Sequence, residues 1–324
     1  YGRNDLTVKS IHAPIWFPLD GNNEKFNLVY EDKVADKSLE VLADVARFAK
    51  RHDCDEVTIH SWFINPSREI SKRDAHVNMA RNLAKIKSDL GNIRVLAEVS
   101  PMVLWGFPDI YDKQTVMVTP QDYQELFDEG DKHGLNLGWD ADIDHMYRSA
   151  IYEYVFGSVN NYLAGVHDAK IDGREEEFRE ITCKQFLMAV NDDAKQTNVL
   201  AYSFIRDMLT KHHDRIGHVS VTGADFIIHR PYLEYNEGIS FEHIPVGFKG
   251  EVVVRNYSKG FSAVEKTEHV EDRLDHSRYI DLVKDKPFVL EFMSRDETFG
   301  QKRKDYDFFE QAGKQKELLE NLLA

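Results

Sequence analysis

The sequence predicts an α/β fold with a parallel β-sheet whose strands are connected by helices. Short apolar runs rich in β-branched residues alternate with longer segments of helical periodicity, which is the pattern of consecutive βαβ units. A length of 324 residues with 42% hydrophobic content is sufficient for one large domain. No run approaches the roughly 18 apolar residues that a membrane span requires. We therefore expect one α/β domain over residues 1–324, not associated with a membrane.

The expected strands each combine a short apolar core with a polar residue near the C-terminal end. They cover residues 6–15, 56–63, 94–100, 135–142, 218–222 and 287–293, with one additional strand at 252–256. Helices are expected between them, near 37–52 and 71–90 and, at the end of the chain, over 305–323. Another should begin at Thr119, because a hydroxyl N-cap followed by proline at the first helical position is a start signal. Residues 146–215 have helical texture throughout and are expected to be an insertion, since they are too long for one crossover.

Composition narrows the function classes. The formal charge of -15 argues against a broad nucleic-acid-binding face, because such faces are basic. Two cysteines, Cys54 and Cys183, are too few for a disulfide framework. The first ten residues lack the charged and apolar regions of a signal peptide, so we expect a cytoplasmic protein.

The strand ends carry side chains that can bind a metal ion. They are His12, His60, Glu98, Asp142 with the nearby His145, His218 and Glu291. In a parallel β/α barrel the C-terminal ends of all strands open on one face, so these residues should converge there. Mixed carboxylate and imidazole ligands suit zinc, manganese, cobalt or magnesium. Trp16, Trp62, Trp105 and Phe107 follow strand ends and are candidate walls around a substrate, with packing at the barrel mouth an equal alternative.

In this order the motifs resemble those of the xylose isomerase-like barrels, which include sugar isomerases, sugar epimerases and endonuclease IV. The matching segments are Ser10-Ile11-His12-Ala13-Pro14, Thr58-Ile59-His60, Glu98 in LAEVS, Asp142-Ile143-Asp144-His145, His218, His243-Ile244-Pro245-Val246-Gly247 and Glu291 in VLEF. The resemblance spans roughly residues 6–293. It implies a TIM-type (β/α) barrel. Only eleven residues precede His12, where the family usually has two β/α units, so we expect missing first units or a homo-oligomer that covers the open sheet.

The resemblance also implies a site. In the isomerase and epimerase branch one divalent metal ion is bound by Glu98, Asp142, His218 and Glu291. Glu98 and Glu291 would be the pair of proton-transferring carboxylates. The residues beside the substrate would be His12, His60, His145, His243 and, at a less typical position, Arg230. The implied substrate is a sugar, a sugar phosphate or a related polyol.

Two alternatives remain open from the sequence. The endonuclease IV branch cleaves abasic DNA with a three-metal cluster whose Asp-x-His pair here reads Phe241-Glu242-His243, so an expected carboxylate is missing. A barrel that binds a metabolite without catalysis is the other alternative. Lys249 is a candidate for binding an anionic group, although a solvated loop lysine is the more common role.

Overall fold

A computed structural model describes most of the chain. The described residues are 9–60, 63–64, 70–99, 114–157, 194–227, 239–244, 246, 249–257, 263–290, 301–302 and 308–323, with scattered positions between 165 and 188. The chain divides into two compact units, which we describe separately. The first comprises residues 1–101, 113–142 and 207–218, and the second comprises residues 102–112, 143–206 and 219–324.

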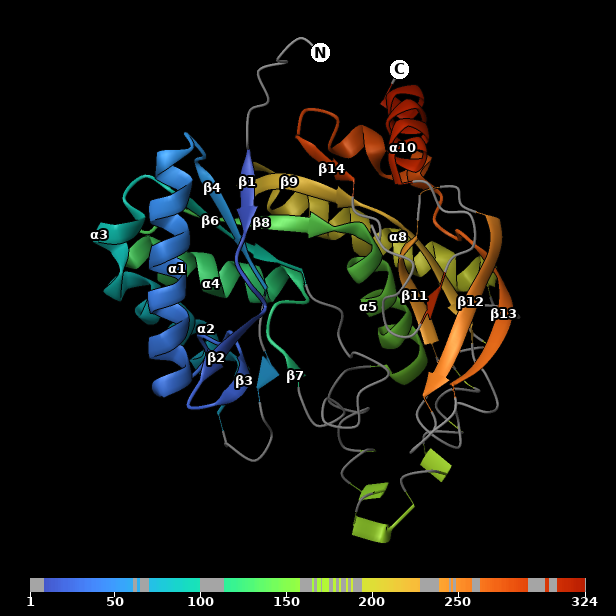
Figure 1. Cartoon of the computed structure of the whole chain (residues 1–324), viewed down its shortest axis with the longest axis horizontal. Coiled ribbons are helices and arrows are strands. Elements are labelled where there is room, and N and C mark those ends of the chain that lie inside the picture. The colour runs from blue at the N-terminus through green and yellow to red at the C-terminus, as the bar shows by residue number, and fades with distance from the viewer. Residues whose placement is uncertain are drawn as a thin grey trace. The chain divides into compact units, whose positions relative to one another are not determined.

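A parallel sheet organises the first unit (Figure 1). Its strands are β1 (Ser10–His12), β4 (Glu56–Ile59), β6 (Arg94–Glu98), β8 (Leu137–Asp142) and the start of β9 (Ile216–Val221). The helices are α1 (Lys33–Arg51), α2 (Lys72–Lys85), α3 (Lys87–Leu90), α4 (Pro120–Lys132) and the short 3₁₀ helix His213–Arg215. Antiparallel pairs are formed by β2 (Trp16–Leu19) with β3 (Asn22–Lys25) and by β5 (Phe63–Ile64) with β7 (Gln114–Thr115).

The register of this sheet separates an apolar face from a polar one. Val95 and Ala97 of β6 lie opposite Leu137 and Trp139 of β8, and Trp139 contacts Tyr123 of α4 at 5.1 Å between ring centroids. Because successive side chains of a strand point to opposite faces, Glu98 lies on the other face. The apolar face packs against α4, and the polar face carries the carboxylates of Glu98 and Asp140.

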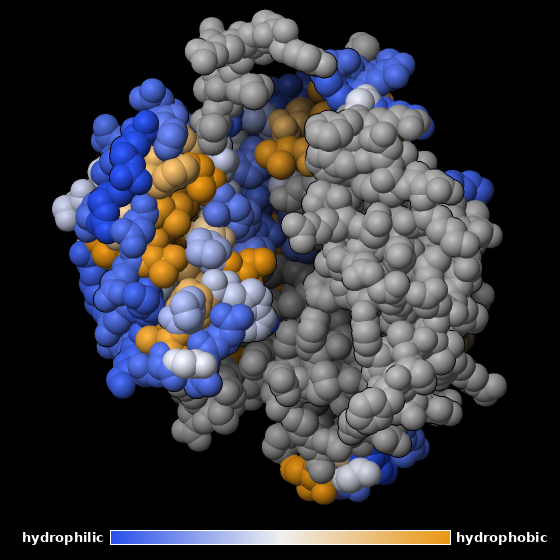
Figure 2. All heavy atoms as spheres, viewed as in Figure 1, coloured by the Kyte–Doolittle hydropathy of each residue, from blue (hydrophilic) through white to orange (hydrophobic). Residues whose placement is uncertain are grey.

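Local sequence explains where the helices start. Thr119 caps α4 through a complete capping box with Asp122, and Pro120 occupies the first turn, as expected from the sequence. Asp32 caps α1 by accepting hydrogen bonds from the amides of Val34 and Ala35. Hydrophilic residues predominate on the face of the first unit that carries α1 and α3 (Figure 2). Smaller hydrophobic areas lie among these hydrophilic residues.

The second unit combines helices with short and long strands. Residues 219–221 of β9 belong to this unit and pair in parallel with β14 (Phe288–Leu290). The strand order of the parallel sheet is β1-β4-β6-β8-β9-β14. The helices are α5 (Ile143–Phe156), α8 (Ala194–Lys211), two 3₁₀ turns (His276–Arg278 and Ile280–Leu282) and α10 (Phe308–Leu323). Antiparallel pairing joins β10 (Gly223–Ile227) to β11 (Ile239–Ile244), and β12 (Lys249–Tyr257) to both β13 (Ala263–Glu271) and β15 (Gln301–Lys302).

The predicted fold class is confirmed: the chain is an α/β protein with a six-stranded parallel sheet, as in part of a TIM-type barrel. The predicted strand 56–63 is interrupted, since β4 ends at Ile59 and β5 begins at Phe63. The additional strand at 252–256 lies in an antiparallel sheet apart from the parallel one. The single-domain organisation and the extent of the insertion stay predictions. No helix in the described part of the chain is long and apolar enough to cross a membrane.

Candidate metal centre

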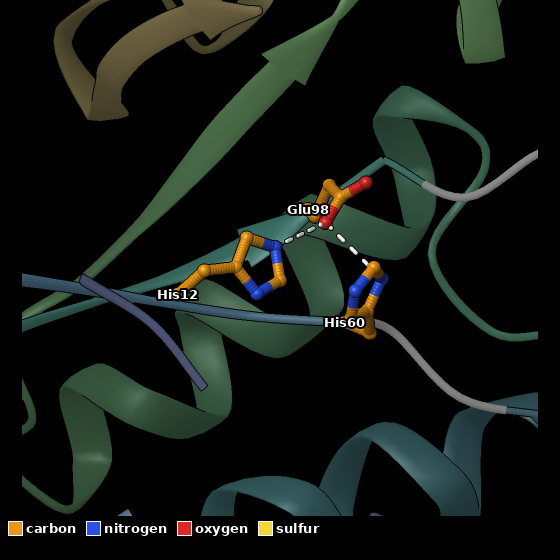
Figure 3. Close-up of side chains that lie close together, drawn as sticks. All are labelled: His12, His60 and Glu98. Carbon is orange, nitrogen blue, oxygen red and sulfur yellow. Dashed lines mark hydrogen bonds and ion pairs between the residues drawn. The ribbon is translucent and has the colours of Figure 1, made fainter. Parts of the chain in front are cut away.

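Three side chains from neighbouring strands meet at Glu98 (Figure 3). His12 ends β1, His60 directly follows β4, and Glu98 ends β6. The Nε2 atom of His12 lies 2.9 Å and the Nδ1 atom of His60 lies 3.2 Å from the same carboxylate oxygen, Oε2 of Glu98. Glu98 is only 4% exposed. A buried carboxylate thus faces two imidazoles at the C-terminal edge of the sheet.

The orientation of His12 is fixed from both sides of its ring. Nδ1 donates a hydrogen bond to the carbonyl of Ala13 at 3.0 Å, which directs Nε2 toward Glu98. Burial alone would lower the pKa of His12, but the hydrogen bond to Glu98 and the charge of this carboxylate raise the pKa to about 9. A histidine whose Nδ1 proton is held by a carbonyl presents Nε2 as its metal-binding atom once the second proton is lost.

Glu98 also approaches a second carboxylate. Its ligand atoms and those of Asp142, the last residue of β8, lie within 4.8 Å of one another. His145 is a buried residue of α5 in the second unit. Glu98 and Asp142 are both buried. Since Glu98 lies close to two imidazoles and to Asp142, it is the central group of the site.

The donor set fits a divalent metal ion. It offers carboxylate oxygens and imidazole nitrogens, which bind zinc, manganese, cobalt and magnesium, and it contains no thiolate. Cys54, the cysteine in the described residues, is buried with its thiol against the carbonyl of Glu56. Two carboxylates brought close together in a buried position repel each other, and a bound cation relieves that repulsion.

His218 is placed differently from the residues around Glu98. Its Nε2 lies 3.0 Å from Oδ2 of Asp140, and its Nδ1 lies 3.8 Å from Oε2 of Glu56. Burial would lower the pKa of His218, but the charge and hydrogen bond of Asp140, aided by Glu56, raise the pKa to about 10. Among the described residues, His218 is not one of the ligand atoms clustered around Glu98.

Some of the remaining candidates lie among the described residues and others do not. Trp16 on β2 is half exposed, and the ammonium group of Lys25 lies 4.7 Å from its ring centroid. Lys249 forms an ion pair with Glu271 at 3.0 Å. His243 and Phe241 lie on β11, with Phe241 opposite Asp225. Outside the described residues are Glu291, Arg230, Trp62, Trp105 and Phe107. The proposed roles of all these residues stay predictions.

Sequence reasoning missed the partners of His218. Asp140 and Glu56 sit on the same side of their strands as the candidate ligands, and the spacing of Asp140 from Asp142 was the available signal. Two residues along a strand place two side chains on one face. The pattern Asp-Ala-Asp in β8 therefore indicates two carboxylates on one face of the sheet, although it does not show that Asp140 pairs with His218.

Comparison with solved structures gives the fold. A D-tagatose 3-epimerase-like protein superposes with a TM-score of 0.50 and 13% sequence identity, over 99% of this chain and 78% of that chain. A xylose isomerase domain protein from Alicyclobacillus acidocaldarius gives a TM-score of 0.46 at 14% identity, covering 98% and 77%. Endonuclease IV from Thermus thermophilus gives 0.43 at 13% identity, covering 97% and 75%.

No protein-family model and no curated protein matches the sequence. The structural likeness therefore defines the fold and no more. This chain shares the β/α fold of the D-tagatose 3-epimerase-like protein, in agreement with the fold that the order of its motifs predicted.

Proposed function

We propose that this protein is a metal-dependent isomerase or epimerase of a sugar, a sugar phosphate or a related polyol. The observation that carries the proposal is the position of Glu98. It is buried at the C-terminal edge of a parallel sheet, faces two imidazoles and approaches the carboxylate of Asp142. In barrels of this type the C-terminal edge of the strands is where active sites lie. The epimerase-like neighbour, with a TM-score of 0.50, supports a sugar as the substrate class.

The proposed ligands of one divalent ion are Glu98 and Asp142, with Glu291 assigned by resemblance alone. A bound ion of this kind would polarise neighbouring substrate oxygens and make the adjacent C–H bond more acidic. Glu98 would then accept the proton at a carboxylate oxygen, and Glu291 would return a proton to the other face of the carbon. His12 and His60 would hold the carboxylate of Glu98 in one orientation.

Deuterium exchange tests this chemistry whichever product is formed. The protein is incubated in D₂O with Mn²⁺ and a panel of ketoses, aldoses and their phosphates, and NMR detects deuterium at the carbon next to the carbonyl. We expect exchange with at least one substrate, and its loss in Glu98→Gln. Glu125→Gln is the matched control, because it makes the same change in a carboxylate of α4 that also pairs with a histidine. Absence of exchange across the panel would contradict the proposal and favour a metabolite-binding barrel.

One observation favours a second candidate, a phosphodiesterase that cleaves abasic DNA. Glu98 lies close to two imidazoles and also to the carboxylate of Asp142, and this donor set would suit more than one ion. Under this alternative His12 and His60 are ligands themselves. The double variant His12→Asn/His60→Asn would then lower the zinc content by one equivalent and abolish cleavage of an abasic duplex. Under the isomerase proposal the same variant keeps one equivalent and binds it more weakly.

A further inference from the structure

The side chain of His218 lies close to carboxylates of two other strands, the buried Asp140 and the partly buried Glu56. Its Nε2 is 3.0 Å from Asp140 on β8 and its Nδ1 is 3.8 Å from Glu56 on β4. The side chains of His218 and Asp140 are 6% and 1% exposed. A ring that bonds a carboxylate at this distance in a buried position can turn to another ligand only by giving up that bond, and breaking a buried ion pair is costly.

Arg94 adds a second positive charge beside Glu56. Its guanidinium lies 3.5 Å from Glu56 and donates to the carbonyl of Ile216, the first residue of β9. Gly138 leaves the room for this side chain, because a Cβ atom at Gly138 would lie 2.5 Å from Nε of Arg94. Two cations, His218 and Arg94, thus face the two carboxylates of Asp140 and Glu56. We call these four residues the inner charge group.

Strand β8 connects the inner charge group to the proposed metal ligands, because it contains both Asp140 and Asp142. Asp140 lies directly opposite Glu98 in the sheet register and precedes Asp142 by two residues on the same face of the strand. Movement of Asp140 would therefore shift Asp142 relative to Glu98. Metal–ligand distances lie within about 0.2 Å of their usual values, so a displaced Asp142 would bind a metal ion more weakly.

We propose that His218 is a positioning residue that holds Asp140, and with it the end of β8, and that it is not a ligand of the metal ion. The inference rests on the metal site of the proposed function and does not depend on which sugar is the substrate. It differs from the ligand role that the resemblance implies for His218. The imidazole contributes to the site through Asp140, by fixing where Asp142 stands relative to Glu98.

Metal titration of the full chain distinguishes the two roles. Calorimetric titration of the apo protein with Mn²⁺, together with elemental analysis, is carried out on four variants: His218→Gln, His218→Leu, Asp140→Asn and Glu98→Gln. A positioning role predicts an unchanged stoichiometry in the first three. His218→Leu and Asp140→Asn should each raise Kd by about 10–100-fold, the range for residues that orient metal ligands. His218→Gln, whose amide can still donate to Asp140, should restore most of the affinity.

The double variant His218→Leu/Asp140→Asn keeps the test decisive. If His218 acts through Asp140, the double variant binds no more weakly than the weaker single variant, because the two changes break one interaction. A ligand role predicts loss of binding in both His218 variants, to the extent seen in Glu98→Gln, and normal binding in Asp140→Asn. That result would overturn the inference. Unchanged binding in Glu98→Gln would instead refute the metal site of the proposed function, and absence of binding in the unsubstituted protein would refute both.

Discussion

Two regions of the first unit contain the same kinds of contact but differ in what they can do. At the metal centre, His12 bonds Glu98 at 2.9 Å and the carbonyl of Ala13 at 3.0 Å. Between α2 and α4, His76 bonds Glu125 at 2.9 Å and the carbonyl of Val116 at 3.0 Å. In each case one ring nitrogen faces a carboxylate and the other a backbone oxygen.

The two regions differ in exposure and in convergence. The side chain of His12 is 38% exposed at the edge of the sheet, whereas that of His76 is 1% exposed between helices. Glu98 contacts two imidazoles and lies close to the carboxylate of Asp142. Glu125 contacts one imidazole, that of His76, and the side-chain amide of Gln121. An imidazole–carboxylate pair alone is thus no sign of a functional site. Several donors from different strand ends that meet at one carboxylate are the stronger indication.

The two regions should differ most in how much their histidines contribute to the free energy of unfolding. His76→Asn removes a buried ring and leaves the Val116 carbonyl without its donor, so we expect a loss of about 2–4 kcal/mol of unfolding free energy. His12→Asn, at a more exposed position, should cost less than about 1 kcal/mol. Urea denaturation of both variants measures the difference. Equal losses would mean that the two histidines have similar structural roles.

Metal affinity should show the opposite order. The double variant His12→Asn/His60→Asn removes both imidazoles from Glu98, and we expect Kd for Mn²⁺ to rise about 10–100-fold at an unchanged stoichiometry. His52→Asn is the control, since His52 is an exposed histidine that follows α1. Calorimetric titration would contradict the account if the control and the double variant bound the ion equally.

A smaller effect is expected at the start of α4. Thr119→Ala removes the N-cap hydroxyl that accepts from the Asp122 amide, which should cost about 1 kcal/mol of unfolding free energy. The change lies on the helix that carries Glu125 and should leave metal affinity unaltered. Thermal unfolding and titration of the same preparation check both parts. A change in metal affinity would show that the helix region and the metal centre are energetically linked.

The smallest effect concerns pH. Burial lowers the pKa of His212, and the Pro120 carbonyl that accepts from its Nε2 offsets this only in part. Because the unfolded chain takes up the proton at a higher pH than the folded chain does, this group stabilises the fold above about pH 6.5. Its contribution is lost as pH falls through the folded-state pKa. The difference in stability between the unsubstituted protein and His212→Gln should therefore shrink from pH 7.5 to pH 5. A difference that grew toward low pH would contradict this assignment.

How much the sequence could predict depended on the range of the interactions. The start of α4 was readable because Thr119, Pro120 and Asp122 are neighbours in the chain. The meeting of His12, His60 and Glu98 was readable because parallel strands end on one edge. The partners of His218 could not be predicted. Whether His218 pairs with Asp140 or reaches the C-terminal edge of the sheet depends on how far along β9 it lies. The bond from His76 to Glu125 spans 49 residues between two helices and has no pattern in the sequence.

The central claim is that Glu98 is the group around which a metal ion binds. Elemental analysis of the unsubstituted protein, Glu98→Gln and Glu125→Gln, each purified without chelator or added metal, tests it most directly. We predict one equivalent of a divalent metal in the unsubstituted protein and in Glu125→Gln, and none in Glu98→Gln. Equal metal content in all three proteins, or loss in Glu125→Gln alone, would contradict the claim.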